Sequence, residues 1–267
     1  MDAIADYELL DSLGTGNHGE FWLARPPARL GLPDGVMVAV KVLAIQATEN
    51  DFDRMANELR IHASVSSPHL APVLDAGQQD GRLFYTTAYY PDGSLDSPAR
   101  PLDRAAVLAA VAGAARACHA LHEAGIAHRD VKPGNILLDE GRGLLGDLGL
   151  AQLLSPGQTV TGIGPVGTVQ FLAPETVRGE PASRASDVWS FGATLHGVVS
   201  GRSIFPGLEQ LDLLGALRTI LSEPPTIDDA IDPSVRTVVA RAVAVDPGDR
   251  HPTAADFADD VERIAAS

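Results

Sequence analysis

Residues 128–135 read "HRDVKPGN" and hold Lys132, one of only two lysines in the 267-residue chain. The other lysine, Lys41, interrupts the apolar run "VMVAVKVLAI" at residues 36–45, and every other positive side chain is an arginine. Lysine carries a compact charge on a slim stem, whereas arginine presents a rigid planar fork. Two lysines in so arginine-rich a sequence therefore indicate two positions where a guanidinium would not serve. Lys41, which lies between valines, is predicted to be in a strand.

Composition limits the class of protein. A chain of 267 residues with 45% hydrophobic and 21% charged residues is typical of a soluble globular protein with one large domain or two lobes. The net charge of −15 argues against binding to nucleic acid or to an anionic membrane. The single cysteine, Cys118, excludes an intrachain disulfide and fits a reducing compartment. Its helical spacing from Ala114 and Leu121 predicts a core position.

The chain shows no signal peptide, because "MDAIADYELL" lacks a basic start and an apolar block. The apolar runs are too short, or too interrupted by charge, to cross a bilayer, which takes about 20 residues. We therefore expect this chain to make no membrane contact.

The pattern of the sequence changes near residues 88–94. Before that point, β-like runs alternate with glycine-containing turns, and one helix is predicted over residues 51–65. After it, a long alanine-rich helix is predicted over 103–124. Further mainly helical segments follow at 185–200, 207–222, 233–244 and 252–265. A small β-rich lobe thus precedes a larger helical lobe.

Gly14, Gly16 and Gly19 form a G-x-G-x-x-G array in "LGTGNHGEFW". The array lies between two strand-like runs, whereas a Rossmann site needs a strand followed by a helix. Glycines let the backbone approach phosphate oxygens and present N–H groups to them. With Lys41 in the next strand, the array predicts a flap over phosphates with a cation behind it.

Taken together, these blocks resemble the catalytic domain of a protein kinase, specifically the bacterial eukaryotic-like (Hanks-type) Ser/Thr kinases. The matching blocks occur in the family's order: "GTGNHGEF", "VAVK", "NELRIHASV", "HRDVKPGN", "GDLGLA", "LAPE", "SDVWSFG" and "DPGDRHPT". The resemblance implies an α+β, bilobal protein kinase fold over residues 1–267. Its parts would be a β-rich N-lobe with one key helix (about 1–88), a hinge (about 88–93) and a mainly helical C-lobe (about 94–267).

The resemblance also implies roles for catalytic residues. Asp130 would orient the substrate hydroxyl and accept its proton, and Lys132 would reach the transferred phosphoryl group. Lys41 would hold the ATP phosphates while paired with Glu58, for which Glu49 is the weaker rival. The metal ligands for Mg²⁺, or for Mn²⁺ in its place, would be Asn135 and Asp147.

The adenine of ATP would be bound by residues from several segments. The implied set consists of Leu13, Phe21, Ala39 and Leu137 around the ring, Thr87 as gatekeeper, and Ala88, Tyr89 and Tyr90 in the hinge. The phosphate flap would be formed by Gly14, Gly16 and Gly19.

The resemblance implies an activation segment over residues 147–175, which is expected to regulate the enzyme together with two arginines outside it. Thr159 and Thr161 are the candidate phosphosites, Ser155 is a weaker one, and Thr168 matches the position that contacts the catalytic aspartate. Arg129 and Arg54 would bind a loop phosphate. Three positions depart from the family's usual residues. They are Leu148 for phenylalanine in "DLG", Gln152 for a basic residue, and His62 for an apolar one, which is expected to pack as a neutral histidine.

Structural roles are also predicted. Glu175 should pair with Arg250, Asp187 should brace the backbone of "HRD", and Trp189 should lie in the core.

The sequence thus predicts an active, non-specific Ser/Thr protein kinase with protein substrates, its own activation loop included. The alternatives are a nucleotide-binding pseudokinase or scaffold, and a small-molecule kinase of related fold. Pairing of N-lobes into a homodimer is a further option. The expected location is the cytoplasm, as a free protein or as a domain of a longer membrane-anchored kinase.

Overall fold

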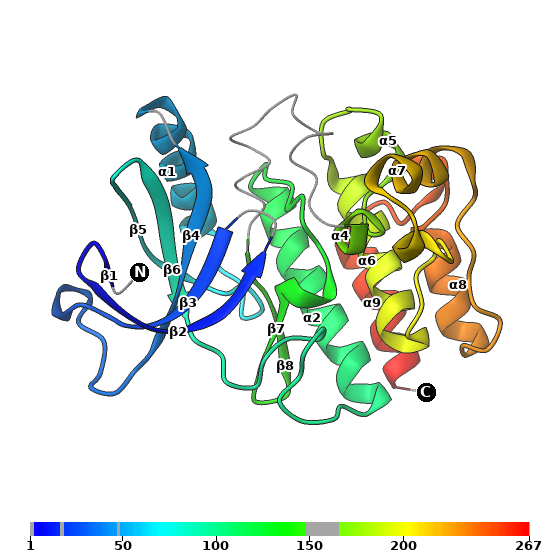
Figure 1. The fold of residues 1–267 in the computed structure, drawn as a ribbon. Helices are drawn as coiled ribbons and strands as arrows, with labels where there is room; N and C mark the ends of the chain where they lie inside the picture. Colours follow the sequence, from blue (N-terminus) through cyan, green and yellow to red (C-terminus); the bar gives the residue numbers. More distant parts are fainter. Residues whose placement is uncertain (1–2, 17–18, 47–48, 148–165, 267) are drawn as a thin grey trace. The chain divides into compact units, whose positions relative to one another are not determined.

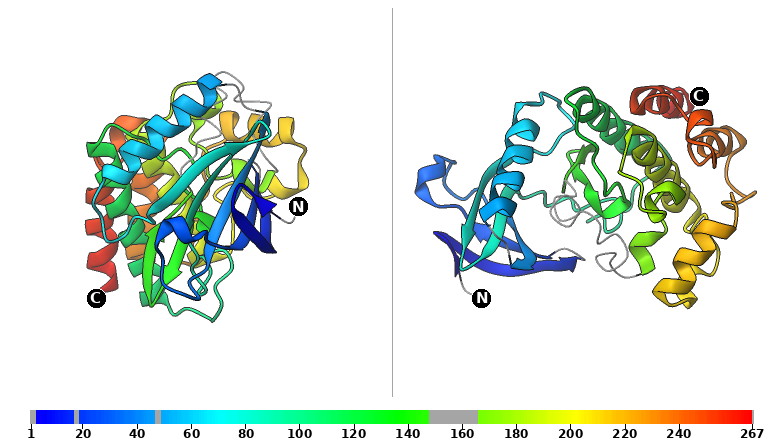
Figure 2. Two further views of the ribbon diagram at one scale, coloured as in Figure 1. Left: turned by 90° about the vertical axis from the view of Figure 1, so that its left-hand side faces the viewer. Right: turned by 90° about the horizontal axis from the view of Figure 1, so that it is seen from above.

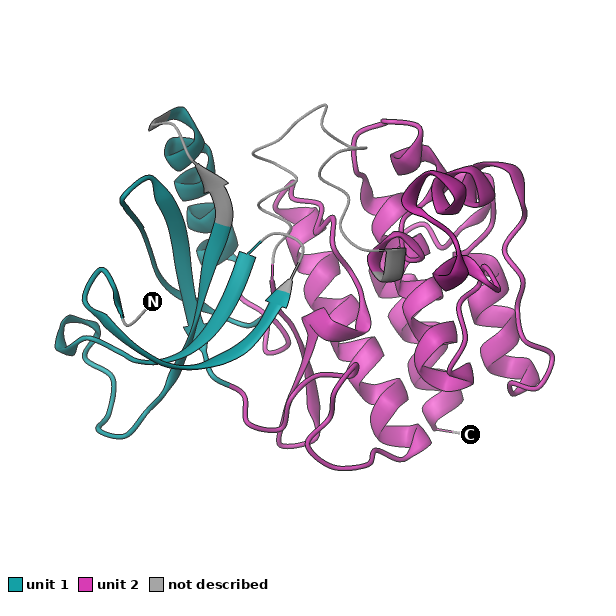
Figure 3. Cartoon of the chain, viewed as in Figure 1, with its two compact units in different colours: residues 1–65, 71–89, 150–156 teal, residues 66–70, 90–149, 157–267 magenta. Residues whose placement is uncertain are grey.

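The computed structural model describes residues 3–16, 19–46, 49–147 and 166–266. The chain divides into two compact units (Figure 3). Of the described residues, unit 1 contains those within 1–65 and 71–89. Unit 2 contains those within 66–70, 90–149 and 157–267.

Unit 1 is built on a six-stranded antiparallel sheet with the strand order β1-β2-β3-β4-β6-β5 (Figure 1). The strands are β1 (Ala3–Ile4), β2 (Tyr7–Gly16), β3 (Gly19–Arg25), β4 (Val38–Gln46), β5 (Val73–Gln79) and β6 (Arg82–Ala88). A short 3₁₀ turn, η1 (Ala28–Leu30), follows β3. Tyr7, Val38, Val40 and Phe84 are buried in the main cluster of this sheet, and the rings of Tyr7 and Phe84 meet edge to face at 5.8 Å. Successive side chains of a strand point to opposite faces of the sheet, so Lys41 lies on the face opposite to Val40 and Val42, and all three are buried.

The helix predicted over 51–65 is α1 (Glu49–Ser64), which packs against β5. Its buried side is formed by Met55, Leu59 and His62, with exposed fractions of 0%, 5% and 4%. The spacing of four and three residues puts these side chains on one helix face. The burial expected for His62 is confirmed.

Unit 2 is mainly helical and contains one two-stranded sheet. Its helices are α2 (Arg104–Glu123), α4 (Val166–Val169), α5 (Pro174–Val177), α6 (Arg184–Ser200), α7 (Leu213–Ser222), α8 (Pro233–Ala242) and α9 (Ala254–Ala265). The strands are β7 (Ile136–Asp139) and β8 (Arg142–Leu145), and the 3₁₀ turns are η2 (Pro133–Asn135), η3 (Leu208–Gln210) and η4 (Pro247–Asp249). Figure 2 shows α2 running alongside α6 and α9, with which it packs closely.

Helix α2 forms the centre of unit 2. It begins at its N-cap Asp103, whose side chain accepts from Ala106 N at 2.8 Å, and its alanines allow close contact with α6, α9 and β8. Cys118 is fully buried on this helix, as predicted. Among the described helices, α2 alone is long and apolar enough to span a membrane, yet 61% of its apolar window is buried inside the protein. This burial is characteristic of the core helix of a soluble domain.

The sequence did not predict four of the strands, namely β1, β5, β7 and β8. Strand β5 reads "VLDAGQQ", which lacks an apolar alternation. Its Gly77 faces the ring of Phe84, and an added Cβ would lie 2.6 Å from that ring. Close packing, not side-chain pattern, therefore specifies this strand. Likewise, the predicted helical stretch 207–222 is divided into η3 and α7, because Asp212 caps a new helix by accepting from Gly215 N at 2.7 Å.

Candidate active site

In unit 2, two polar side chains converge on the carboxylate of Asp130, in residues 128–135, which are called the catalytic loop below. Asp130, only 5% exposed, accepts at Oδ2 from Lys132 Nζ at 2.8 Å and from Asn135 Nδ2 at 2.9 Å. Asn135 Nδ2 also donates to the backbone oxygen of Asp130 at 2.7 Å. The second carboxylate oxygen, Oδ1, accepts no hydrogen bond from the residues that the structure describes. Asp130 is thus fixed through Oδ2, while no donor of the described residues occupies Oδ1.

The hydrogen bonds of Asn135 determine how its side-chain amide is oriented. Because the amide nitrogen already makes two bonds to Asp130, the amide is oriented with Oδ1 as its remaining acceptor. Gly146 N donates to the backbone oxygen of Asn135 at 2.9 Å, which brings the residue preceding Asp147 to this loop. Asp147 is half-buried and adopts a left-handed φ of 55°. An amide oxygen and a carboxylate are oxygen ligands of the kind that Mg²⁺ prefers, so the two residues fit this ion.

The backbone of the loop is braced by Asp187 at the start of α6, as predicted. Asp187 accepts from His128 N at 2.7 Å, from Arg129 N at 2.9 Å, and contacts His122 Nε2 at 2.8 Å. Although burial raises the pKa of Asp187, the hydrogen bond and charge of His122 lower it overall. The brace fixes Arg129 in a left-handed conformation, with φ of 74°, directly before Asp130. Such strain needs surrounding bonds to maintain it.

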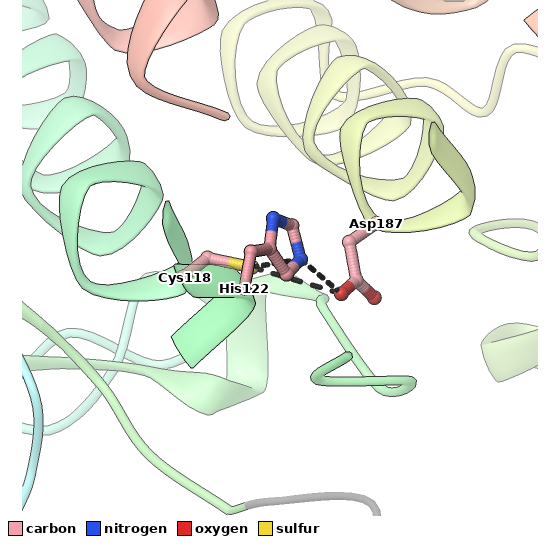
Figure 4. A group of neighbouring side chains, drawn as sticks. All are labelled: Cys118, His122 and Asp187. Carbon is pink, nitrogen blue, oxygen red and sulfur yellow. Dashed lines mark hydrogen bonds and ion pairs between the residues drawn. The ribbon is translucent and has the colours of Figure 1, made fainter. Parts of the chain in front are cut away.

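Cys118, His122 and Asp187 lie close enough to ligate a metal ion (Figure 4). Cys118 Sγ is 3.3 Å from His122 Nε2 and 3.7 Å from Asp187 Oδ2. Burial and the neighbouring carboxylate raise the pKa of the Cys118 thiol well above its ordinary value, whereas a metal ligand must be a thiolate. Since Asp187 is already engaged by the loop backbone, the three side chains form a structural brace and not a metal centre.

His128 makes a second contact, which joins the loop to the segment that precedes Asp147. Its Nε2 lies 3.0 Å from Gly146 O, one residue before Asp147. Burial lowers the pKa of His128, which favours the neutral imidazole at physiological pH. The sequence did not predict this contact, nor the part that Cys118 and His122 play in the brace. The only signal was the helical spacing of Cys118 and His122, which by itself indicates shared packing.

In unit 1, Lys41 is 5% exposed on β4, between the neighbouring strands β3 and β6. Its cross-strand partners are Phe21 and Tyr85, and Nζ lies 4.8 Å and 5.9 Å from their ring centroids. Both rings are close enough for cation–π attraction. Glu58 is half-buried on α1, where its pairing with Lys41 stays a prediction, and Arg54 is exposed one turn earlier.

The predicted phosphate flap is the β2–β3 hairpin, in which Gly16 pairs with Gly19. Gly14 and Gly19 have φ of 137° and 148°, which L side chains rarely adopt. The two differ in their surroundings, because a Cβ on Gly19 would overlap Val42 O, whereas a Cβ on Gly14 would meet no atom of the described residues within 4 Å. Gly19 therefore allows close strand contact, and Gly14 leaves the hairpin surface open.

The predicted adenine-binding residues occur in both units. In unit 1, register places Ala39 opposite Thr87 and Phe21 opposite Gly14, Tyr89 N donates to Met37 O at 3.4 Å, and Leu13 is 41% exposed. Ala88, which ends β6, accepts from the hydroxyl of Thr87 at 3.3 Å. In unit 2, Tyr90 and Leu137 are half-buried. Their role as adenine contacts stays a prediction.

Most activation-segment predictions cannot be placed. Leu148, Gln152, Ser155, Thr159 and Thr161 lie outside the described residues. Thr168 is described, half-buried in α4.

The predicted ion pair between Glu175 and Arg250 is confirmed, and it is bidentate with distances of 2.6 and 2.9 Å. Arg250 also lies over the ring of Trp189, 5.0 Å from its centroid, and Trp189 is fully buried as predicted. This pair is part of the core of unit 2.

Comparisons with known proteins agree with this arrangement. The family model "Protein kinase domain" matches residues 7–260, so the chain belongs to the protein kinase family. Among similar proteins are the serine/threonine-protein kinases PknK of Mycobacterium bovis (33% identical) and PknA of Mycobacterium tuberculosis (34% identical). Each match covers 97% of this chain. The crystal structure of the PknI kinase domain of Mycobacterium tuberculosis is similar with a TM-score of 0.72 at 27% identity. That match covers 98% of this chain and 97% of the other.

The chain spans 24% of the length of PknK and 61% of that of PknA. The predicted fold class, a protein kinase fold with a β-rich lobe and a helical lobe, is confirmed.

Proposed function

We propose that this chain is an ATP-dependent protein kinase that transfers the γ-phosphoryl group of ATP to serine and threonine hydroxyls of proteins. The observation that carries the proposal is the arrangement around Asp130. One carboxylate oxygen is fixed by Lys132 and Asn135, and the other accepts nothing from the described residues. Membership of the protein kinase family and the names of similar proteins support the same activity.

The reaction joins the substrate oxygen to the γ-phosphorus and breaks the bond from that phosphorus to the β–γ bridging oxygen. Asp130 Oδ1 would accept a hydrogen bond from the substrate hydroxyl, orient it, and take its proton as the new bond forms. Lys132 would stabilise negative charge on the transferred group, since its Nζ lies 2.8 Å from Asp130 Oδ2. Catalysis then comes mainly from positioning and charge stabilisation by residues fixed in advance.

Nucleotide binding would involve residues of both units. Asn135 Oδ1 and Asp147 would hold Mg²⁺, which neutralises phosphate charge when bound, and Mn²⁺ has the same ligand preference. Lys41, paired with Glu58, would bind the α- and β-phosphates under the glycine flap. The adenine would contact the side chains named above on β2, β3, β4 and β7 and the backbone of residues 88–90.

Regulation by phosphorylation is part of the proposal. A phosphate on Thr159 or Thr161 would bind Arg129, whose backbone conformation is fixed by Asp187, and Arg54 on α1. Thr168 would contact Asp130 in the active state. Pairing of the small lobes into a homodimer, and a location in the cytoplasm or on the cytoplasmic side of a longer membrane-anchored protein, complete the proposal.

The test is transfer of labelled phosphate from Mg·ATP to an added generic basic protein, followed by identification of the phosphorylated residue type. Phosphoserine and phosphothreonine are expected with the wild type and not with Asp130→Asn. Binding of ATP without any transfer would favour the pseudokinase alternative. Transfer only to a small molecule would contradict the proposal.

A further inference from the structure

Unit 2 has a surface hollow of about 490 Å³ outside the catalytic loop. Four segments line it, namely the start of α2, the end of α6, the turn after α6 and the segment before α8. Among its lining residues are Arg104, Arg202, Asp228, Ile231 and Asp232. The volume lies within the range of small-ligand pockets, about 300–1,000 Å³, so the hollow has room for an organic group.

The walls of the hollow are fixed by His196 on α6, which is 1% exposed. Asp228 N donates to His196 Nε2 at 3.0 Å, so the other ring nitrogen, Nδ1, carries the proton and donates to Arg202 O at 2.9 Å. Burial lowers the pKa of His196, which favours this neutral form at physiological pH. Thr226 N also donates to Ile204 O at 2.7 Å. The two walls are therefore joined before any ligand binds.

Two arginines of the hollow have N–H groups that the described chain does not use. Arg104 forms an ion pair with Asp232 at 3.6 Å, and its guanidinium donates no hydrogen bond within the described ranges. Arg202 donates one hydrogen bond, from Nη1 to Asp228 Oδ2 at 3.0 Å. A guanidinium has five N–H groups in a planar fork, so each arginine retains several donors for a ligand.

The two aspartates of the hollow are already bound to backbone N–H groups. Asp232 is the N-cap of α8 and accepts from Ser234 N at 2.9 Å, and Asp228 accepts from Ala230 N at 2.9 Å. These bonds hold both carboxylates in the wall and compensate part of their charge. The two arginine side chains are 49% and 74% exposed, so they are the groups that can reach a ligand.

The donors of the hollow fit a phosphate group. A phosphate monoester has three acceptor oxygens and can accept from two arginine forks at once, whereas a carboxylate has only two oxygens. The carbon atoms next to the phosphate would pack on Ile231, which is buried in the hollow. Because the arginine side chains are exposed to solvent, the phosphate can belong to a side chain of a larger molecule.

We propose that this hollow binds a phosphoserine or phosphothreonine side chain of a protein segment through Arg104 and Arg202. The inference goes beyond the proposed function, because it adds a binding site that takes no part in phosphoryl transfer. A protein that is already phosphorylated would stay bound at the hollow while the catalytic loop acts on another hydroxyl.

The experiment is titration calorimetry on the dephosphorylated full chain. Mg²⁺ and a non-hydrolysable ATP analogue are present at saturating concentration, so that a nucleotide site takes up none of the probes. The probes are a neutral peptide with one phosphoserine, the same peptide with serine or glutamate in its place, and inorganic phosphate. The phosphopeptide should bind about tenfold more tightly than each of the other three probes.

Arg104→Gln and Arg202→Gln should each weaken binding of the phosphopeptide about tenfold, because each removes charge-assisted hydrogen bonds. The matched control is Arg263→Gln. The Arg263 side chain is 72% exposed and forms an ion pair with Asp260 at 2.6 Å, so it resembles Arg202 in exposure and pairing. This variant should bind the phosphopeptide like the wild type. A melting curve of each variant checks that it is folded.

Equal binding of the phosphopeptide and the serine peptide would overturn this inference, as would unchanged affinity in both variants of the hollow. Equal loss in Arg263→Gln would show attraction to surface charge in general and would overturn it too. Binding of inorganic phosphate as tight as that of the phosphopeptide would overturn the assignment to a protein segment. These measurements involve no phosphoryl transfer, so their failure leaves the proposed function standing.

Discussion

The catalytic loop of unit 2 and the glycine hairpin of unit 1 are built in opposite ways. Around the catalytic loop, Asp187 on α6 accepts from the backbone of His128 and Arg129, and His128 contacts the backbone oxygen of Gly146, so two other segments of unit 2 fix the loop. The hairpin exposes Leu13 and has open space over Gly14. Proton and phosphoryl transfer need fixed geometry, whereas phosphate binding by backbone N–H groups benefits from a hairpin that can adjust.

The largest effect is expected from removing the brace. In Asp187→Ala, the N–H groups of His128 and Arg129 lose their buried acceptor, which should lower the free energy of unfolding by about 3–5 kcal/mol and abolish transfer. Urea unfolding and a transfer assay measure the two effects. As a control, alanine at the exposed Asp249 should change the unfolding free energy by less than about 0.5 kcal/mol. An Asp187→Ala protein as stable as wild type would contradict the role of the brace.

The two lysines should differ in their tolerance of arginine. Lys41→Arg places a larger planar group between the rings of Phe21 and Tyr85 in a buried strand, so kcat/KM should fall about a hundredfold. The Lys132 side chain is 20% exposed, and Lys132→Arg should cost only about tenfold because the charge still reaches Asp130. Equal losses of kcat/KM in Lys41→Arg and Lys132→Arg would contradict the prediction that the buried lysine tolerates arginine less well.

Within the hairpin, Gly19→Ala should be more damaging than Gly14→Ala. Both add strain of about 1–2 kcal/mol at a positive φ, but at Gly19 the new Cβ also overlaps Val42 O. Thermal unfolding and KM for ATP should both rank the variants in this order. A larger loss in Gly14→Ala than in Gly19→Ala would mean that the contact of Gly19 with β4 is not what limits substitution in the hairpin.

The last prediction is a pH dependence that comes from three histidines of unit 2. Burial lowers the pKa of His128, His196 and His251 below the ordinary value of 6.5, so the unfolded chain binds more protons than the native one below that pH. The stability due to these groups is full above about pH 7 and is lost as the pH falls through 6.5. Each histidine adds up to about 1.4 kcal/mol per pH unit.

Urea unfolding between pH 7.5 and about 5 measures this slope, and His251→Gln should reduce it by about one proton. A stability that is constant across this range would show that burial does not lower the pKa of these histidines in the native protein.

The sequence predicted the elements that have an apolar periodicity and missed those that are held by tertiary contacts. The helices α1, α2, α6, α8 and α9 follow from apolar periodicity and caps, and Lys41 was placed in a strand by its valine neighbours. Strand β5 could not be predicted, because its polar residues are held by pairing with β6 and by the contact of Gly77 with Phe84. Tertiary contact outweighs local propensity in such a segment.

In the candidate site, residues of one local motif were likewise predicted, whereas a partner from another helix was not. Asp130, Lys132 and Asn135, which were picked out by their motif, are in contact in the structure, and the predicted bracing by Asp187 is confirmed. His122 was not recognised as a partner of Asp187, since the two residues come from different helices and no local pattern connects them.

Asp130 is the proposed base of the kinase, bonded at Oδ2 and without a donor at Oδ1 among the described residues. Its most direct test is intact mass after incubation with Mg·ATP, for wild type and Asp130→Asn, with ATP binding measured for both by melting shift. We predict mass steps of one phosphate in the wild type alone, and a similar nucleotide-dependent melting shift in both proteins. A mass step of equal rate in Asp130→Asn would contradict the account.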